Sequence, residues 1–201
     1  MSAMTYRGKT IPVLTLEPDW SNQVTITAVY RSVIFESLDT SEERHGLSPR
    51  PLYRVAYQAL TLSGAESGYC RRITDLSGAV PVCCPMWTDY AILTSAVAIG
   101  GTTLAVDSTD QSLWQVLQDY CLVRSDWRTW ELLQVALVSS TTITLVDPTT
   151  KLWPSGARVY PVVFGRLTRQ DWTALTDEHS NVPVQVDEIF NLIGNQGRVE
   201  S

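Results

Sequence analysis

Two groups of carboxylates are the residues whose spacing comes closest to a catalytic arrangement. The first is the pair Asp107 and Asp110, and the second comprises Asp171, Asp177 and Glu178. Hydrolysis of a glycosidic bond needs two carboxyl groups roughly 5–10 Å apart across the sugar. Both groups fall in segments predicted to be turns, where an aspartate commonly hydrogen-bonds the nearby backbone. We therefore favour a turn role for them, and a glycoside hydrolase stays the less favoured alternative.

Nucleophilic and metal chemistry find weaker support in the sequence. A hydrolytic triad needs a serine or cysteine beside a histidine, but His45 and His179 are the only histidines and both lie in polar, turn-rich segments. The four cysteines, which lack the spacing of metal ligands, are Cys70, Cys83, Cys84 and Cys121. We interpret them as small buried side chains of a protein made in a reducing compartment. No catalytic residue, metal or cofactor is expected.

The bulk composition indicates a folded protein with many large aromatic side chains. The net charge is −6 and no run of Lys or Arg forms a basic stripe, so no specific nucleic-acid binding is expected. The sequence shows no signal-peptide segment and no apolar run of about 20 residues, so no membrane is expected either. Seven Trp and eight Tyr suit either the cores of small β-domains or protein–protein interfaces.

A near-repeat, displaced by 39 residues, is the clearest pattern in the elements that must position these side chains. Residues 102–106 (TTLAV) match residues 141–145 (TTITL), and the pair Leu113-Trp114 matches Leu152-Trp153. Each copy is followed by a second apolar stretch. Two such units predict a small pseudo-symmetric β-barrel whose two Leu-Trp pairs fill its core.

Turn residues divide the rest of the chain into short apolar segments, which predicts a mainly β fold. We expect an antiparallel β-sandwich-like N-terminal domain and, after it, the small β-barrel that carries the near-repeat. The expected divisions are an N-terminal arm, the sandwich-like domain, the barrel and a C-terminal segment, at residues 1–22, 23–88, 89–166 and 167–201. The alternating run 182–186 (VPVQV) predicts a last strand that returns to the first domain, followed by a mobile tail.

Three features of the sandwich-like region are specific enough to test. Strands are predicted over residues 24–30 and 52–60, which are rich in β-branched and bulky side chains. Gly64 and Gly68 predict a turn. The polar stretch 39–50, closed by prolines at its end, predicts a loop.

Two stretches together resemble tail-tip proteins of long-tailed bacteriophages, of the distal-tail or baseplate-hub type. The first stretch contains Pro18-Asp19-Trp20, then Glu43-Arg44, then Pro49-Arg50 and Tyr53. The second runs from Gly101-Thr102-Thr103 through Glu131 and Leu145 to residues 153–161 (WPSGARVYP). That family carries a G-x-E-x-R…R loop after an opening strand, and then a small β-barrel. Here Leu38-Asp39-Thr40 stands where the family has its glycine.

The resemblance implies a structural function without catalysis. Copies of the chain would form a closed ring, a hexamer or a trimer, at the tail tip or baseplate, in contact with tail-tube, hub and tail-fibre proteins. The chain would stay in the host cytoplasm until it joins the tail of the virion. Candidate contacts between subunits are the aromatic anchors Trp20, Trp87 and Trp172 and the charged residues Glu43, Arg44 and Arg50. A carbohydrate-binding β-module, with exposed Trp rings as a sugar platform, is the alternative.

Overall fold

β-strands dominate the structure, which is a computed structural model, so the mainly β class is confirmed. It describes residues 5–6, 9–30, 32–36, 42–46, 50–76, 81–117, 119–126, 128–168, 173–174 and 180–189. The largest sheet has its main strands in the order β3 (Thr25–Val29), β6 (Leu52–Thr61), β15 (Ser180–Glu188), β13 (Arg158–Leu167), β10 (Tyr120–Arg124), β11 (Trp130–Ser139), β12 (Thr142–Leu145) and β9 (Thr103–Ala105). Every pair of neighbours in it is antiparallel.

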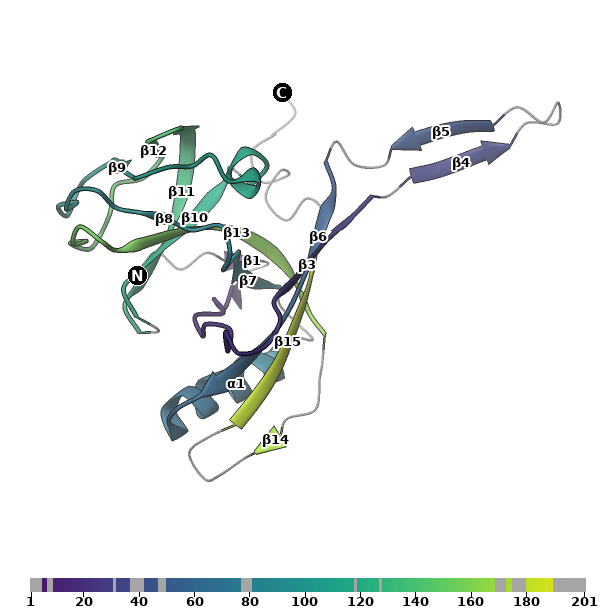
Figure 1. Ribbon diagram of the computed structural model, residues 1–201, viewed down its shortest axis with the longest axis horizontal. Helices are drawn as coiled ribbons and strands as arrows, with labels where there is room; N and C mark the ends of the chain where they lie inside the picture. The colour runs from purple at the N-terminus through teal and green to yellow at the C-terminus, as the bar shows by residue number, and fades with distance from the viewer. Residues whose placement is uncertain are drawn as a thin grey trace.

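Shorter strands complete the architecture (Figure 1). Strands β7 (Val82–Pro85) and β8 (Ala91–Ile92) pair with β13, and β14 (Thr173–Ala174) pairs with β15. Strands β1 (Thr5–Tyr6) and β2 (Lys9–Thr10) form one separate two-stranded sheet, and β4 (Ser32–Glu36) and β5 (Glu42–Gly46) form another. A single turn of 3₁₀ helix, η1, spans Ser112–Gln115.

Two hydrophobic cores lie on opposite faces of the central strands. Leu122, Leu132 and Tyr160 belong to the first core, whereas their chain neighbours Cys121 and Leu133 belong to the second. Both faces are buried along β10, most of β13 and the first half of β11, so β10 and β13 carry apolar runs and lack the alternation of a half-exposed strand. The long strand β13 is therefore shared by both halves of the molecule.

The expected return strand is present as β15. It pairs with β6 from Ser180–Thr61 to Asp187–Arg54, and its end pairs with β13. Val182, Val184 and Val186 are buried in the first core, in agreement with their period of two. A broadly sandwich-like arrangement is consistent with this first half of the chain.

An extended segment near the N-terminus, residues 11–16, covers one side of the first core. Val13 forms a parallel bridge with Cys83, and the Leu14 amide donates to the Cys83 carbonyl at 2.8 Å. Ile11, Val13, Leu14 and Leu16 are all buried there. The segment expected to be an arm is thus part of the packed body over these residues.

A helix, α1 (Gly64–Leu76), replaces the turn predicted from Gly64 and Gly68. The Ser63 hydroxyl accepts a hydrogen bond from the Glu66 amide at 3.3 Å, and the Glu66 carboxylate reaches back to the Leu62 amide at 2.6 Å. This arrangement is a variant of the capping box, because the Glu66 carboxylate accepts from the amide one residue before the capping serine instead of from the serine amide itself. The prediction of a turn was wrong because the S-x-x-E signal outweighs two glycines.

The small β-barrel predicted over residues 89–166 is not closed. Its strands run from β8 through β13, β10, β11 and β12 to β9, and the two end strands touch through one isolated bridge, Leu93–Val106. Two backbone hydrogen bonds flank that bridge, from Thr94 N to Ala105 O and from Asp107 N to Ile92 O, each 2.9 Å long. Strands β8 and β9 have only two and three residues, which is too short for a continuous ladder.

The 39-residue near-repeat is only partly reflected in the packing. The rings of Trp114 and Trp153 are both buried in the second core, as their matching positions predict. Their neighbours differ, because Leu113 is buried in the first core whereas Leu152 is 67% exposed. The prediction that both Leu-Trp pairs fill one core is therefore right for the tryptophans and wrong for the leucines.

Candidate assembly surface

One end of the large sheet is open at β3. Among the strands that the structure describes, β3 pairs with β6 alone, from Thr25–Ala56 to Val29–Leu52. Its sequence, TITAV, contains no charge and no proline, which are the usual devices that protect a free edge. An open uncharged strand edge is a ready template for another strand.

Exposed aromatic rings stand at both ends of this edge. Trp20 precedes β3 and is 55% exposed, and Tyr30 follows it and is 79% exposed. The Asp19 side chain fixes the turn that holds Trp20, because its Oδ1 accepts from the Ser21 amide at 3.0 Å and its Oδ2 from Asn22 Nδ2 at 2.7 Å. Hydrogen bonds from Ser21, with a smaller one from Asn22, lower the pKa of the Asp19 carboxyl.

The hairpin β4–β5 lies next to this edge in sequence and projects away from the body (Figure 1). Its register runs from Ser32–Gly46 to Glu36–Glu42, which places the backbone of Glu43 and Arg44 opposite Phe35 and Ile34. The loop predicted over residues 39–50 is therefore wrong for the stretch that forms β5. The side chains of Glu43 and Arg44 lie outside the described residues, so their predicted contacts stay a prediction.

Arg50, at the base of the hairpin, is paired within its own chain. Its Nη2 donates to Glu188 Oε1 at 2.5 Å and its Nη1 to Glu188 Oε2 at 3.1 Å. The Tyr53 amide donates to the same Oε2 at 2.7 Å. Burial alone would lower the pKa of Arg50, but the hydrogen bond and charge of Glu188 outweigh it and raise that pKa. Glu188 thus supplies within the chain the two-oxygen partner that the Arg guanidinium favours, and a contact of Arg50 with another subunit stays a prediction.

Trp87 is a core residue, which corrects its prediction as a surface anchor. The ring is 1% exposed and packs edge-on against Tyr57 and Tyr160, with centroids 6.3 and 5.2 Å away. The Arg124 guanidinium lies over it, 5.0 Å from the ring centroid. Trp172 lies outside the described residues. Of the three predicted anchors, Trp20 is the one placed on the surface.

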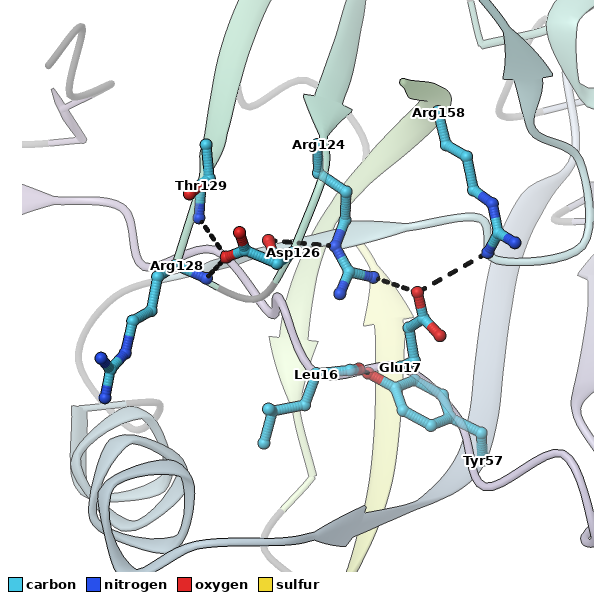
Figure 2. A network of polar contacts seen from close by, with 8 residues as sticks. All are labelled: Leu16, Glu17, Tyr57, Arg124, Asp126, Arg128, Thr129 and Arg158. Atoms are coloured by element: carbon cyan, nitrogen blue, oxygen red, sulfur yellow. Dashed lines mark hydrogen bonds and ion pairs between the residues drawn. The ribbon is translucent and has the colours of Figure 1, made fainter. Parts of the chain in front are cut away.

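A charge network that the sequence analysis missed joins the N-terminal segment to the central strands (Figure 2). Glu17 Oε1 accepts from Arg124 Nη1 at 2.7 Å and lies 3.7 Å from Arg158 Nη1. Arg124 and Arg158 are register partners on β10 and β13. Like charges directly opposite each other destabilise a sheet, so the Glu17 carboxylate compensates a repulsion that the strand pairing creates. No sequence signal predicts this, because it depends on the register.

The carboxylates considered for hydrolysis serve turns where the structure describes them. Asp107 Oδ1 accepts from the amides of Ile92 and Ser108, both at 2.8 Å, and Asp110 Oδ2 accepts from the Ser108 hydroxyl at 2.9 Å. The second group, with Asp171, Asp177 and Glu178, lies outside the described residues, as does His179. Within the described ranges, no three His, Cys, Asp or Glu side chains gather as metal ligands.

A groove of about 350 Å³ lies between β10, β11 and the turn before Lys151. Its lining includes Glu131, a buried carboxylate that accepts from the Thr150 amide and hydroxyl at 2.7 Å and from Trp153 Nε1 at 2.9 Å. Glu131 therefore ties the turn to the core ring of Trp153. Because Glu131 accepts these hydrogen bonds from its own chain, we assign it a structural role.

Comparison with known proteins gives no family. No family model matches the chain, and no curated protein is significantly similar to it. Within the described residues, no helix is long and apolar enough to cross a membrane. The surface formed by the β3 edge, Trp20, Tyr30 and the β4–β5 hairpin is the best candidate for function, and we refer to it as the assembly surface.

Proposed function

We propose that this chain is a virion structural protein of a tailed phage. Copies form a closed ring at the tail tip or baseplate and connect the tail tube to the receptor-binding apparatus. The chain resides in the host cytoplasm before assembly and in the virion tail afterwards. Its partners are further copies of itself and the tail-tube, hub and tail-fibre proteins.

The observation that carries this proposal is the assembly surface. The open, uncharged β3 edge and the projecting hairpin both carry backbone groups without a partner strand among the described residues. Strands of other chains can pair with these groups. Exposed Trp20 and Tyr30 add rings of the type enriched in protein interfaces. The resemblance of the sequence to tail-tip proteins supplies the kind of assembly.

Two measurements test the proposal together. Native mass spectrometry and electron micrographs of the purified chain should show closed rings, of six or three copies. The gene should lie beside genes for a tape-measure protein and tail fibres. A chain that stays monomeric and whose gene has no tail genes nearby would overturn the proposed function.

The carbohydrate-binding alternative is tested on the same sample. Trp87, Trp114 and Trp153 are buried, so these three rings do not form a sugar platform. Specific binding of the monomer to a glycan array, lost in Trp20→Ala, would favour that alternative over the ring.

A further inference from the structure

The β4–β5 hairpin has bonding capacity that its own body does not use. Both strands have five residues and, among the described strands, each pairs only with the other. Each therefore has one edge without a neighbouring strand. A lone two-stranded ribbon is marginally stable in water, so this hairpin gains from a surface that it can pair with. Its first strand includes the consecutive apolar residues Val33, Ile34 and Phe35 in the sequence.

The β3 edge can accept such a strand. It also has five residues, and at about 3.3 Å per residue both segments span roughly 17 Å. Thr25, Thr27 and Ala28 are exposed along it. The strand is thus open on the side away from β6, with no bulky charged side chain to keep another strand away.

The hairpin cannot serve the β3 edge of its own chain in this structure, because it points away from the sheet (Figure 1). The Arg50–Glu188 pair and the Tyr53–Glu188 hydrogen bond fix the chain at the hairpin base to β15. A matching edge is nevertheless present in every copy. The occupant that the structure itself supplies for each open edge is the hairpin of a second copy.

We propose that the β4–β5 hairpin of one copy adds to the β3 edge of the next copy. This contact is head-to-tail, since donor and acceptor are different surfaces, and such a contact closes into rings when the rotation between copies permits. The main-chain hydrogen bonds of an added strand provide affinity. Trp20 and Tyr30, at the two ends of the edge, bracket the added hairpin. The inference deepens the proposed ring function and rests on it.

Two variants separate donor from acceptor. The donor-deleted chain replaces residues 31–49 with an Asn-Gly linker, which is feasible because β3 and β6 are antiparallel neighbours. The acceptor-blocked chain is Thr25→Lys/Thr27→Lys, which puts charges on two exposed edge positions. Its matched control is Thr102→Lys/Thr141→Lys, two exposed threonines on the other half. Circular dichroism and thermal melting first establish that each chain is folded.

Native mass spectrometry and analytical ultracentrifugation then read the assembly state. The donor-deleted chain should be monomeric, and the acceptor-blocked chain should lose self-association at least tenfold while its control assembles like the wild type. Mixed together, the two defective chains should form a 1:1 complex that does not grow, because one functional hairpin and one functional edge remain.

Each alternative outcome has a distinct meaning. Rings from the donor-deleted chain would overturn the hairpin contact and leave the proposed ring function intact. Rings from the acceptor-blocked chain at the wild-type concentration would overturn the β3 edge as the acceptor. Two defective chains that ignore each other would overturn the donor–acceptor arrangement. A monomeric wild-type chain would overturn the inference and the ring together.

Discussion

The outer strands at the two ends of the large sheet differ in whether their free edges have a partner. At the β9 end, the chain meets the end of β8 through the isolated Leu93–Val106 bridge and its two flanking hydrogen bonds, without closing into a barrel. At the β3 end, none of the described strands covers the outer edge, and exposed rings stand on either side of it. The β3 end presents, among the described strands, an unpaired strand edge and exposed aromatic rings.

We expect this difference to separate residues that maintain the fold from residues that take part in the proposed assembly. The indoles of Trp114 and Trp153 lie in the second core, and the near-repeat therefore belongs to the scaffold. Trp20 and the projecting hairpin lie away from it. Substitutions in the half with the near-repeat should change stability, and substitutions at the β3 edge or the hairpin should change self-association.

The largest contrast is expected between Trp153 and Trp20. Trp153→Ala removes a buried ring and its hydrogen bond to Glu131, and should lower the free energy of unfolding by about 3–5 kcal/mol. Trp20→Ala should change that free energy by less than about 0.5 kcal/mol while weakening self-association. Urea denaturation measures the first quantity and sedimentation the second. A Trp20→Ala chain that is unfolded would assign this ring to the core.

The base of the hairpin should show the next largest effect. Glu188→Ala removes the buried acceptor shared by Arg50 and the Tyr53 amide. Because the Arg50 side chain is partly exposed to water, we expect the free energy of unfolding to fall by about 2–3 kcal/mol. This is less than the loss expected when one partner of a fully buried ion pair is removed. The neighbouring pair of Arg54 and Asp187 is exposed, so Asp187→Asn is the matched control, with a loss under about 1 kcal/mol. Equal losses in thermal or urea unfolding would contradict the assigned burial.

Alkaline pH offers a comparison between the two cores through their thiols. Burial is the main cause that raises the pKa of Cys121 in the second core, and it raises the pKa of Cys70 in the first core to about 12. An unfolded thiol ionises near pH 9.0. Each buried thiol therefore makes its full contribution to the free energy of unfolding below that pH, and this contribution falls as the pH rises. The loss is about 1.4 kcal/mol per pH unit above it.

Cys121→Ala and Cys70→Ala should each make unfolding less dependent on pH between 9 and 11. Urea denaturation at several pH values provides the slopes. Native thiols should also resist iodoacetamide at pH 8, because the thiolate is the reactive form. Rapid labelling of the folded chain at that pH would show that one of these thiols is accessible.

The smallest effect is expected at the Glu17 network. Glu17→Gln removes the charge between Arg124, which is buried, and Arg158, which is half exposed. Glu17 itself is partly exposed, so we expect a loss of about 1 kcal/mol, decreasing at high salt. Arg158→Gln should cost less than about 0.5 kcal/mol, since its distance to Glu17 is 3.7 Å. A larger loss in Arg158→Gln than in Glu17→Gln would reverse this assignment.

Period and β-branched content were sufficient to predict strands where one face or both are buried. The alternation of Val182, Val184 and Val186 predicted β15 and its return to the first half. The Leu residues of β11 fit a strand because the first half of this strand meets a core on each face. β5 escaped prediction because its sequence, EERHG, is polar and lacks the usual strand composition.

Candidate contacts were harder to predict than strands, because residue type does not reveal burial or partner. Trp20 and Trp87 both follow a proline-containing segment, yet one ring is exposed and the other is buried. Arg50 was predicted to pair with a residue of another subunit, but the end of β15 places Glu188 beside it. Glu17 gained its role from the pairing of two arginines on different strands. These outcomes depend on long-range register, which no local pattern encodes.

Strand β15 gives the molecule a direction of mechanical strength. It pairs with β6 along nearly its whole length, and Glu188 at its end holds Arg50 and the Tyr53 amide at the hairpin base. Hydrogen bonds in an antiparallel pair run perpendicular to the strands. A tensile load applied to the hairpin along β6 would therefore be shared as shear by all these bonds at once, whereas a load across the sheet would peel them apart in turn.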